Sequence, residues 1–590
     1  MIKELLINNF EGGMTNDPRK QDSRFARLLK HFDILAAKNR LAPYYSLVAE
    51  AAANTEKLVQ FLAHSTKQYA LGVVSGTSRV KIFQRASLPV GAWAETHATL
   101  AEGTTADYIR SEYLFIEYKD VFYGAMYLNS TTTSIWSFAP AGPTFTEVAY
   151  DLGLTADLSA SNIEVSGLVH SKDDILYIAY DNKVIKKDGA AAFVTALSIP
   201  TNQVITSICE DGDYLVIGAK SKYSGGKSVS YHWDRNTANL DYTTAKTDWG
   251  TGRLQIIEEL SGDVVAVLVS TSTAATLAPK IVFKYRTGNG SKQFAEIKSE
   301  NIPATAVGIT KQKVNNRILF QMGIQIQGIQ ENGIVSVGRA DDTGALAVSI
   351  DRVLSTAVKD TAFFVPKGFQ LLEDYMTAAY DASGYVCLVT NNSGNYLSPS
   401  VYESLITNFG DSDLTKKLLT VAVSFEPLPA DGQVILKYRI NEEGINSWQR
   451  IFKHTTDDSI SHAANQIEIG SETVTMTIAS PAVVTLANHD LAPGQAIRFR
   501  TTGALPTGVT AGTTYYVKST GLATSTFQFS ATEGTDGTAV NTSGSQSGVH
   551  TLERDANLRE FKEAQFRIES TGGAVITGLK IKVEEINKNL

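Results

Sequence analysis

A β-hairpin pattern that recurs along the chain constrains its fold more than any other feature of the sequence. In residues 214–234 (YLVIGAKSKYSGGKSVSYHWD), apolar residues alternate with their neighbours on both sides of a turn that contains Gly225-Gly226. Alternation with period two is typical of strands, and a Gly-Gly turn between two such runs predicts a hairpin. The fold must therefore accommodate many short antiparallel strands.

Six similar hairpins occur between residues 67 and 404. They lie at residues 67–84, 112–129, 173–189, 262–285, 316–338 and 384–404. Several of the seven follow a further short strand that ends in an acidic turn, such as VITSICEDGD before residue 214 and LQIIEELSGD before residue 262. Together these strands make most of a four-stranded antiparallel blade.

Repeats of this size, none of which can bury its own faces, favour radial stacking into a β-propeller. We predict six or seven blades over residues 46–408, because the interval 338–384 has room for an irregular blade or a loop. Tandem β-sandwiches are the alternative. The absence of Pro/Ser-rich linkers between the hairpins disfavours them.

The first 45 residues differ from the rest and are predicted to form an N-terminal arm. A short strand at Lys3 to Phe10 is followed by apolar residues at helix-like spacing, which indicates a short helix or an irregular basic segment. Its basic residues are Arg19, Lys20, Arg24, Arg27, Lys30, Lys38 and Arg40. Two interpretations remain open, a solvated face and an arm that docks on a neighbouring subunit.

A polar break at residues 408–413 ends the propeller region. Strand pairs at 418–452 and 559–586 then predict one antiparallel β-sandwich, built from residues 409–470 and 554–590. Between them, residues 471–553 are rich in Thr, Ala, Gly and Ser, and contain three short strand patterns, AIRFR, TYYVK and TFQFS. We predict a small β-domain inserted into a surface loop of the sandwich.

Composition and charge exclude only a few classes of protein. Apolar residues make up 43% and charged residues 19% of the 590 residues, which indicates a globular chain. The formal net charge of −8 provides no overall basic surface for gripping nucleic acid. The two cysteines, Cys209 and Cys387, lie in apolar strands and are expected to be buried thiols. No signal-peptide core or 18-residue apolar run occurs, so we expect a soluble protein made in the cytosol.

No arrangement of residues predicts a catalytic, cofactor-binding or metal site, and the chain is predicted not to be an enzyme. The candidates considered are Asp173-Asp174, Asp211-Gly212-Asp213 and Asp341-Asp342 for calcium, Glu258-Glu259 and Glu373-Asp374 for glycoside hydrolysis, His232, and Tyr44-Tyr45, Tyr396 and Tyr402 for sugar stacking. The aspartates do not continue into a 12-residue calcium loop, and Asp and Gly are ordinary turn residues. Neighbouring carboxylates in a strand point to opposite faces. His232 is expected to be a packed strand residue, and strand tyrosines more often fill core than stack on sugars.

The inserted domain resembles a small module found in bacteriophage tail and other virion proteins. The residues that carry the resemblance are His489, Leu491, Gly494, Ile497 and Phe499, then Gly503, Leu505, Pro506, Gly508 and Val509, then Thr514, Tyr515, Tyr516 and Val517, and finally Phe527, Phe529 and Ser530. INNFEGGMTNDPR (7–19) is similar to the opening of phage tail proteins in which this motif precedes a propeller, and FEPLPADG (425–432) is similar to a turn of their C-terminal sandwich.

These resemblances cover about a fifth of the chain and imply a structural tail protein related to the nozzle proteins of short-tailed phages. They imply assembly in several copies around the tail axis, with other tail proteins as partners, and the positions of nozzle, tail-tip hub and decoration all remain open. Genomic DNA would pass without sequence-specific binding, and the location would be the virion. The alternative is a host-receptor protein that binds surface glycan through the propeller face or the inserted domain. A glycan-degrading propeller enzyme is a third hypothesis.

Overall fold

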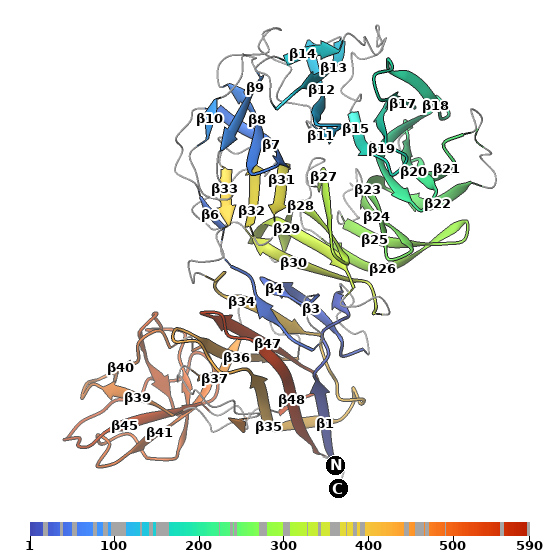
Figure 1. Cartoon of the computed structure of the whole chain (residues 1–590). Helices are drawn as coiled ribbons and strands as arrows, with labels where there is room; N and C mark the ends of the chain where they lie inside the picture. The colour runs from blue at the N-terminus through green and yellow to red at the C-terminus, as the bar shows by residue number, and fades with distance from the viewer. Residues whose placement is uncertain are drawn as a thin grey trace. The chain divides into compact units, whose positions relative to one another are not determined.

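The computed structural model describes the chain as an assembly of β-sheets in two compact units (Figure 1). The described residues are 1–15, 22–35, 39–45, 47–49, 56–74, 80–85, 93–95, 114–129, 132–140, 145–148, 165–223, 225–236, 240, 245–270, 280–298, 307–326, 329–339, 344–353, 366–372, 375–380, 386–389, 396–441, 448–454, 465–466, 471–489, 491–554 and 560–586. The regular elements in these ranges are all β-strands, which confirms the all-β prediction. No helix of the described part has the length and apolarity of a membrane span.

The unit Tyr45–Asn395 is a β-propeller, and its described residues form seven four-stranded antiparallel blades. The innermost strands are β7 (Glu56–His64), β11 (Leu114–Tyr118), β15 (Val165–His170), β19 (Gln203–Asp211), β23 (Arg253–Leu260), β27 (Val307–Val314) and β31 (Pro366–Leu372). The second strands are β8 (Lys67–Val74), β12 (Val121–Asn129), β16 (Ile175–Tyr180), β20 (Tyr214–Ser221), β24 (Asp263–Ser270), β28 (Arg317–Ile326) and β32 (Tyr375–Tyr380). The third strands are β9 (Val80–Arg85), β13 (Thr132–Phe138), β17 (Lys183–Asp188), β21 (Lys227–Trp233), β25 (Lys280–Thr287), β29 (Ile329–Gly338) and β33 (Val386–Val389). The outer strands are β10 (Ala94–Glu95), β14 (Phe145–Val148), β18 (Val194–Ser198), β22 (Lys246–Thr251), β26 (Gly290–Lys298), β30 (Ala347–Val353) and β6 (Leu47–Ala49).

The ring closes through the first and last blades. Each innermost strand contacts the next one, and β31 of the seventh blade contacts β7 of the first. The outer strand of the seventh blade is β6, which comes from the start of the unit and pairs with β33, with the backbone of Cys387 in register with that of Ala49. Residues from the two ends of the repeat region therefore share one sheet, and the blades form a closed ring. The uncertain interval 338–384 supplies β30, β31 and β32.

Packing between blades explains why the central strands are buried on both faces. In β20 the residues from Leu215 to Ala219 are all buried. Ile217 and Trp233 belong to a core that also contains Tyr177 of the preceding blade, and the Tyr177 and Trp233 rings lie 5.9 Å apart at 85°. Each blade thus completes the core of its neighbour, as radial stacking requires.

The hairpin predicted at residues 214–234 is confirmed as β20 and β21 of the fourth blade, and the strand predicted before it is β19, the innermost strand. One other interpretation of a hairpin needs correction. Residues 384–404 do not form a hairpin, since β33 belongs to the seventh blade whereas β34 (Ser400–Ser404) pairs with strands of the other unit. Alternation predicts strands but does not say which strand is the partner of which.

The unit Met1–Tyr44 with Tyr396–Leu590 contains two antiparallel sheets and the inserted domain. One sheet has the order β1 (Ile2–Ile7), β48 (Ile576–Ile586), β35 (Thr415–Phe425) and β38 (Asn465–Gln466), with β46 (Glu560–Phe561) beside β35. The other runs β3 (Phe25–Lys30), β34, β47 (Ala564–Thr571), β36 (Gln433–Ile440) and β37 (Gln449–His454), with β2 (Gly13–Met14) parallel to β3, and a small pair is formed by β4 (Phe32–Asp33) and β5 (Ala42–Pro43). Val423, Leu436, Ile568 and Ile581 of these sheets are fully buried, as the predicted sandwich requires.

The strand predicted at Lys3 to Phe10 is confirmed as β1, whereas the short helix or irregular segment predicted after it is wrong at Phe25–Lys30, which is strand β3. β1 pairs along its whole length with β48, and β3 pairs with β34, so both are sheet strands of this chain. Leu28 and Leu29 are both buried, because β3 carries a register shift between Ala26 and Leu28. That irregularity produced the helix-like spacing in the sequence.

The inserted domain forms a seven-stranded sheet with its own core. Its strands are β39 (Ser471–Met476), β40 (Val484–Thr485), β41 (Ala496–Thr501), β42 (Thr514–Val517), β43 (Thr526–Phe527), β44 (Phe529–Ser530) and β45 (His550–Arg554). The three predicted strand patterns correspond to β41, β42 and the β43–β44 pair. Phe499, Tyr515 and Phe529 pack ring against ring at 4.9–5.9 Å in the centre of this core.

Candidate functional site: the charged turn face of the propeller

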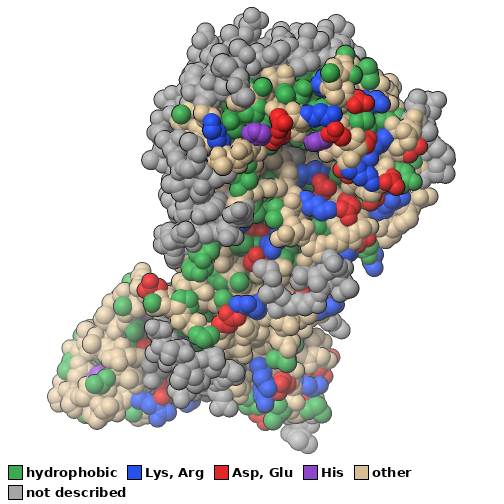
Figure 2. Space-filling view, in the orientation of Figure 1, with side chains coloured by type: hydrophobic (Ala, Val, Ile, Leu, Met, Phe, Trp, Pro, Cys, Tyr) green, Lys and Arg blue, Asp and Glu red, His purple; other side chains and the backbone are tan. Residues whose placement is uncertain are grey.

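The turns that join innermost to second strands lie on one face of the propeller and carry most of its described charged contacts. Side chains of neighbouring turns meet there, as in the ion pairs of Lys119 with Asp174 (2.8 Å) and Lys172 with Asp213 (2.6 Å). Figure 2 shows basic, acidic and histidine side chains gathered around a hollow in this part of the molecule. We call this surface the turn face.

Glu210, at the end of β19, is the centre of one network on the turn face. It accepts hydrogen bonds from the Ser171 hydroxyl, the Lys172 backbone N–H (3.0 Å) and Arg235 Nη2 (2.7 Å). The Tyr177 hydroxyl donates to Asp173 at 3.0 Å, and burial followed by the Asp173 charge raises the pKa of Tyr177. Ser171 and Lys172 belong to the third blade and Glu210 belongs to the fourth, so this network joins the two blades.

His232 is buried and neutral at physiological pH. Its Nε2 lies 2.8 Å from Arg286 Nη1 and 3.5 Å from Asp211 Oδ2. Burial and the adjacent Arg286 charge lower the pKa of His232 to about 4, while burial and the Glu259 charge raise the pKa of Asp211. Neutral Nε2 therefore accepts from Arg286, and the prediction that His232 is a packed strand residue is confirmed.

The middle of the propeller holds a cavity of about 280 Å³ lined by innermost strands. Gln60 of β7 reaches across to Thr310 of β27, with 3.4 Å between Nε2 and Oγ1. Lys311 donates from Nζ to the carbonyl oxygens of Ile208 (2.7 Å) and Ile257 and pairs with Glu258 at 2.8 Å. Side chains of the innermost strands thus link blades that are not adjacent in the ring.

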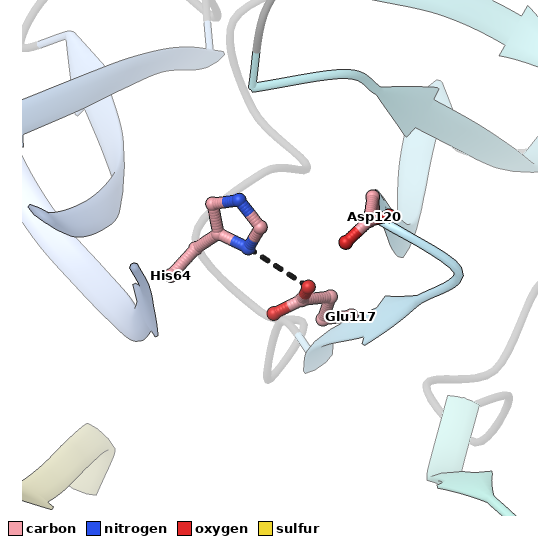
Figure 3. Close-up of side chains that lie close together, drawn as sticks. All are labelled: His64, Glu117 and Asp120. Atoms are coloured by element: carbon pink, nitrogen blue, oxygen red, sulfur yellow. Dashed lines mark hydrogen bonds and ion pairs between the residues drawn. The ribbon is translucent and has the colours of Figure 1, made fainter. Parts of the chain in front are cut away.

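A third group on the turn face joins the first two blades (Figure 3). His64 ends β7, Glu117 lies in β11, and Asp120 lies in the turn after β11. His64 Nδ1 is 2.8 Å from Glu117 Oε1, and ligand atoms of all three residues lie within 4.8 Å of one another. Sequence reasoning missed this group, because the histidine is over 50 positions from the carboxylates and no spacing signal connects them. The available signal was a His at the end of one inner strand and carboxylates at the end of the next inner strand and in its turn.

The candidate carboxylates that the structure describes are each engaged with a cationic, hydroxyl or imidazole side chain. Glu258 is paired with Lys311, and Glu259 with Lys313, which lowers the pKa of Glu259 against the opposing effect of burial. Asp173 and Asp211 are engaged as described above, and Asp341-Asp342 and Glu373-Asp374 lie outside the described residues.

The tyrosines considered for sugar stacking are largely inaccessible. Tyr44 and Tyr402 are buried, at 8% and 1% exposure, so stacking by these two rings is excluded. Tyr396 is half-buried and lies against Gly573. Tyr45 is also half-buried and packs on the core around Phe369.

No family model matches the chain, and no curated protein matches it. Among solved structures, a polysaccharide lyase (ulvan lyase) is similar over 59% of this chain and 95% of its own, with 10% identity and a TM-score of 0.38. The xyloglucanase of Xanthomonas campestris covers 60% of this chain and 56% of its own at 10% identity and a TM-score of 0.33. BamB from Moraxella catarrhalis is similar over 57% of this chain and 82% of its own, with 11% identity and a TM-score of 0.31.

These similarities concern the fold alone. They nevertheless correct one prediction, that the chain is not an enzyme. Similar structures include a polysaccharide lyase, a xyloglucanase and an arabinofuranosidase, which are enzymes. The absence of a catalytic motif in the sequence was an insufficient ground for that prediction, because function resides in sites rather than in folds.

Proposed function

We propose that this chain is a structural component of a bacteriophage tail, present in several copies around the tail axis and contributing to the wall of the DNA ejection conduit. The observation that carries the proposal is the inserted domain. Its motif residues Ile497, Phe499, Val517, Phe527 and Phe529 are fully buried in one core. A motif made of core positions specifies a module's fold, and the burial of these residues supports the proposal that this domain is a virion module.

The motif glycines support the same interpretation. Gly508 has φ +104°, and a Cβ there would lie 2.2 Å from the Asn541 carbonyl oxygen. At Gly503 a Cβ would lie 2.4 Å from the Ser547 carbonyl oxygen. Only glycine permits such close backbone approach, so both positions are required by the turns of this particular module.

The N-terminal and sandwich motifs also act as structural elements. Phe10 is buried against Tyr402, with ring centroids 5.3 Å apart, and Gly13 adopts φ +67°. In the FEPLPADG turn, the Gly432 N–H donates to the Pro429 carbonyl at 2.7 Å. The residues resembling tail proteins thus form turns and packing of the unit that contains both chain ends.

DNA would pass along the axis of the assembly and not through the propeller. Gln60 of the first blade contacts Thr310 of the sixth among the innermost strands, and the cavity that these strands line is about 280 Å³. A duplex needs a conduit far wider than this, and such a conduit is available only between subunits arranged as a ring.

Imaging tests this proposal directly. The full-length chain is purified and examined by negative-stain electron microscopy, and phage particles that contain it are labelled with gold-conjugated antibody. We expect rings of several copies and label confined to the tail. A chain that remains monomeric and labels no particle would contradict the proposal.

Binding of host glycan is the alternative. The exposed tyrosines of the described propeller, Tyr214 and Tyr223, stand at opposite ends of β20, about 25 Å apart by strand rise, so they form no common stacking surface. Binding to host cells that is lost on deletion of residues 471–553 would favour the alternative.

A further inference from the structure

We propose that His64, Glu117 and Asp120 bind one divalent transition-metal ion of the zinc type at the junction of the first and second blades. The proposal rests on the geometry of the propeller and is independent of the proposed tail function. One ring nitrogen of His64 and one oxygen of each carboxylate lie within 4.8 Å of one another. Small side-chain rotations bring such atoms to the separations found around a tetrahedral ion with bonds of about 2.0–2.2 Å.

The donor set selects the class of metal. Calcium and magnesium prefer oxygen ligands only, whereas an imidazole with two carboxylates suits zinc and its neighbours. Three protein ligands leave one position of a tetrahedral site for water. The site is also reachable, since the His64 and Glu117 side chains are 25% and 31% exposed and Asp120 is exposed.

The two lysines nearest to this group along the chain, Lys119 and Lys67, contact other residues and do not neutralise its carboxylates. Lys119, between them in sequence, pairs with Asp174 of the next blade at 2.8 Å. Lys67, opposite His64 in its own turn, donates to Gln84 at 3.4 Å. Among the described residues, Glu117 has His64 as its one polar partner and Asp120 has none. A metal ion would balance these two negative charges.

The His64 ring is held in place by aromatic packing. Phe122 meets it edge to face at 5.6 Å and 82°, and Phe122 is itself packed against Tyr69 and Phe115. A ligand whose ring is oriented before the ion arrives loses little conformational entropy on binding.

Two other histidines of the turn face provide a contrast. His170 contacts Asp174 at 3.0 Å, but the Lys119 ammonium occupies the same carboxylate. His232 lies near Asp211, but the Arg286 guanidinium is 2.8 Å from its Nε2 and excludes a second cation. The His64 group differs from both in having two carboxylates and no cation among its described contacts.

Calorimetric titration of the chelator-treated, full-length protein with zinc chloride tests the site. We expect one zinc per chain at this site and a loss of at least about ten-fold in affinity in Asp120→Asn, with a similar loss in His64→Gln. Asp120→Asn preserves the fold, because Asp120 has φ +58° and asparagine tolerates that conformation. Asp213→Asn is the matched control, an exposed turn carboxylate of another blade that pairs with Lys172.

Zinc affinity equal in wild type and in both site variants would overturn the proposal, as would the absence of zinc binding. Calcium chloride titrated in the same way is expected to give no heat of binding that Asp120→Asn removes. If calcium bound there and zinc did not, the assignment to a transition metal would be wrong.

Discussion

The propeller and the inserted domain use short β-strands in opposite ways. The core shared by the third and fourth blades draws on residues from Val169 to Ala245, and each blade is completed by its neighbour. The core of the inserted domain lies wholly between Val474 and Leu552. A ring of repeats depends on contacts between segments distant in sequence, whereas the inserted domain is one local unit.

The propeller and the inserted domain also differ in the number and arrangement of their charged contacts. On the turn face, ion pairs and hydrogen bonds link adjacent blades, as Glu210 does with Ser171 and Arg235. In the inserted domain charge is sparse, and its main network is at the base, where Glu472 bridges Arg450 of the sandwich and Arg554 of β45 at 2.6 Å each. The comparison indicates that the propeller distributes its stability around a ring, while the inserted domain has a core of its own and contacts the sandwich through Arg450.

The largest expected effect is on the inserted domain's core. Phe499→Ala removes a fully buried ring that contacts Tyr515 and Phe529, and should cost about 3–5 kcal/mol of that domain's unfolding free energy. Calorimetry should show one transition shifted downward and the propeller transition unchanged. Val549→Ala, at a side chain 50% exposed, is the control. A downward shift of both transitions would show that the domain is not a separate unit.

In the propeller, Ile217→Ala should cost about 2–4 kcal/mol, because the side chain is fully buried between blades. The loss should lower the single transition of the whole ring, since neighbouring blades share this core. Val194→Ala, at an exposed position of the third blade, should leave the transition in place. Local melting of one blade, seen by hydrogen exchange with the others still protected, would argue against a cooperative ring.

At the base of the inserted domain, Glu472→Ala should cost about 2–3 kcal/mol. Arg450 and Arg554 are 2% exposed and would lose their carboxylate partner, whereas Glu472 itself is 29% exposed, which moderates the effect. Limited proteolysis should then cleave at the ends of residues 471–553 faster than in the wild type. Arg500→Ala breaks an exposed pair with Glu553 and serves as the control. Equal cleavage rates in the Glu472 and Arg500 variants would show that Glu472 does not stabilise the base of the inserted domain.

The smallest effect concerns pH. The pKa of His232 is about 4 in the folded protein, against an ordinary histidine pKa of 6.5, so the unfolded chain binds more protons between these values. Propeller stability should therefore fall as pH decreases from about 6.5 to about 4, by about 1–3 kcal/mol, and this contribution should be constant above pH 7. Denaturant unfolding of wild type and His232→Gln over this range measures it. The variant should have the flatter profile, and parallel profiles would exclude His232 as the cause.

Much of the architecture could be predicted from local sequence. Alternating residues and turn glycines determine the hairpins, as at Gly212 (φ +57°) in the turn between β19 and β20 and at Gly508 in the inserted domain. Strand partners could not be predicted, because alternation is the same whether β33 pairs with β34 or with β6. The His64 group was equally inaccessible, since its members meet only where two blades stack.

By itself, the sequence determined the all-β class, the repeated blade, the separate sandwich and the inserted domain, since each follows from periodicity or from turn residues close together in the chain. The tertiary structure decided the seventh blade, the closure of the ring by β6 and the meeting of the acidic turns on one face. Those features depend on pairing between residues hundreds of positions apart, such as Cys387 with Ala49, for which strand periodicity carries no information.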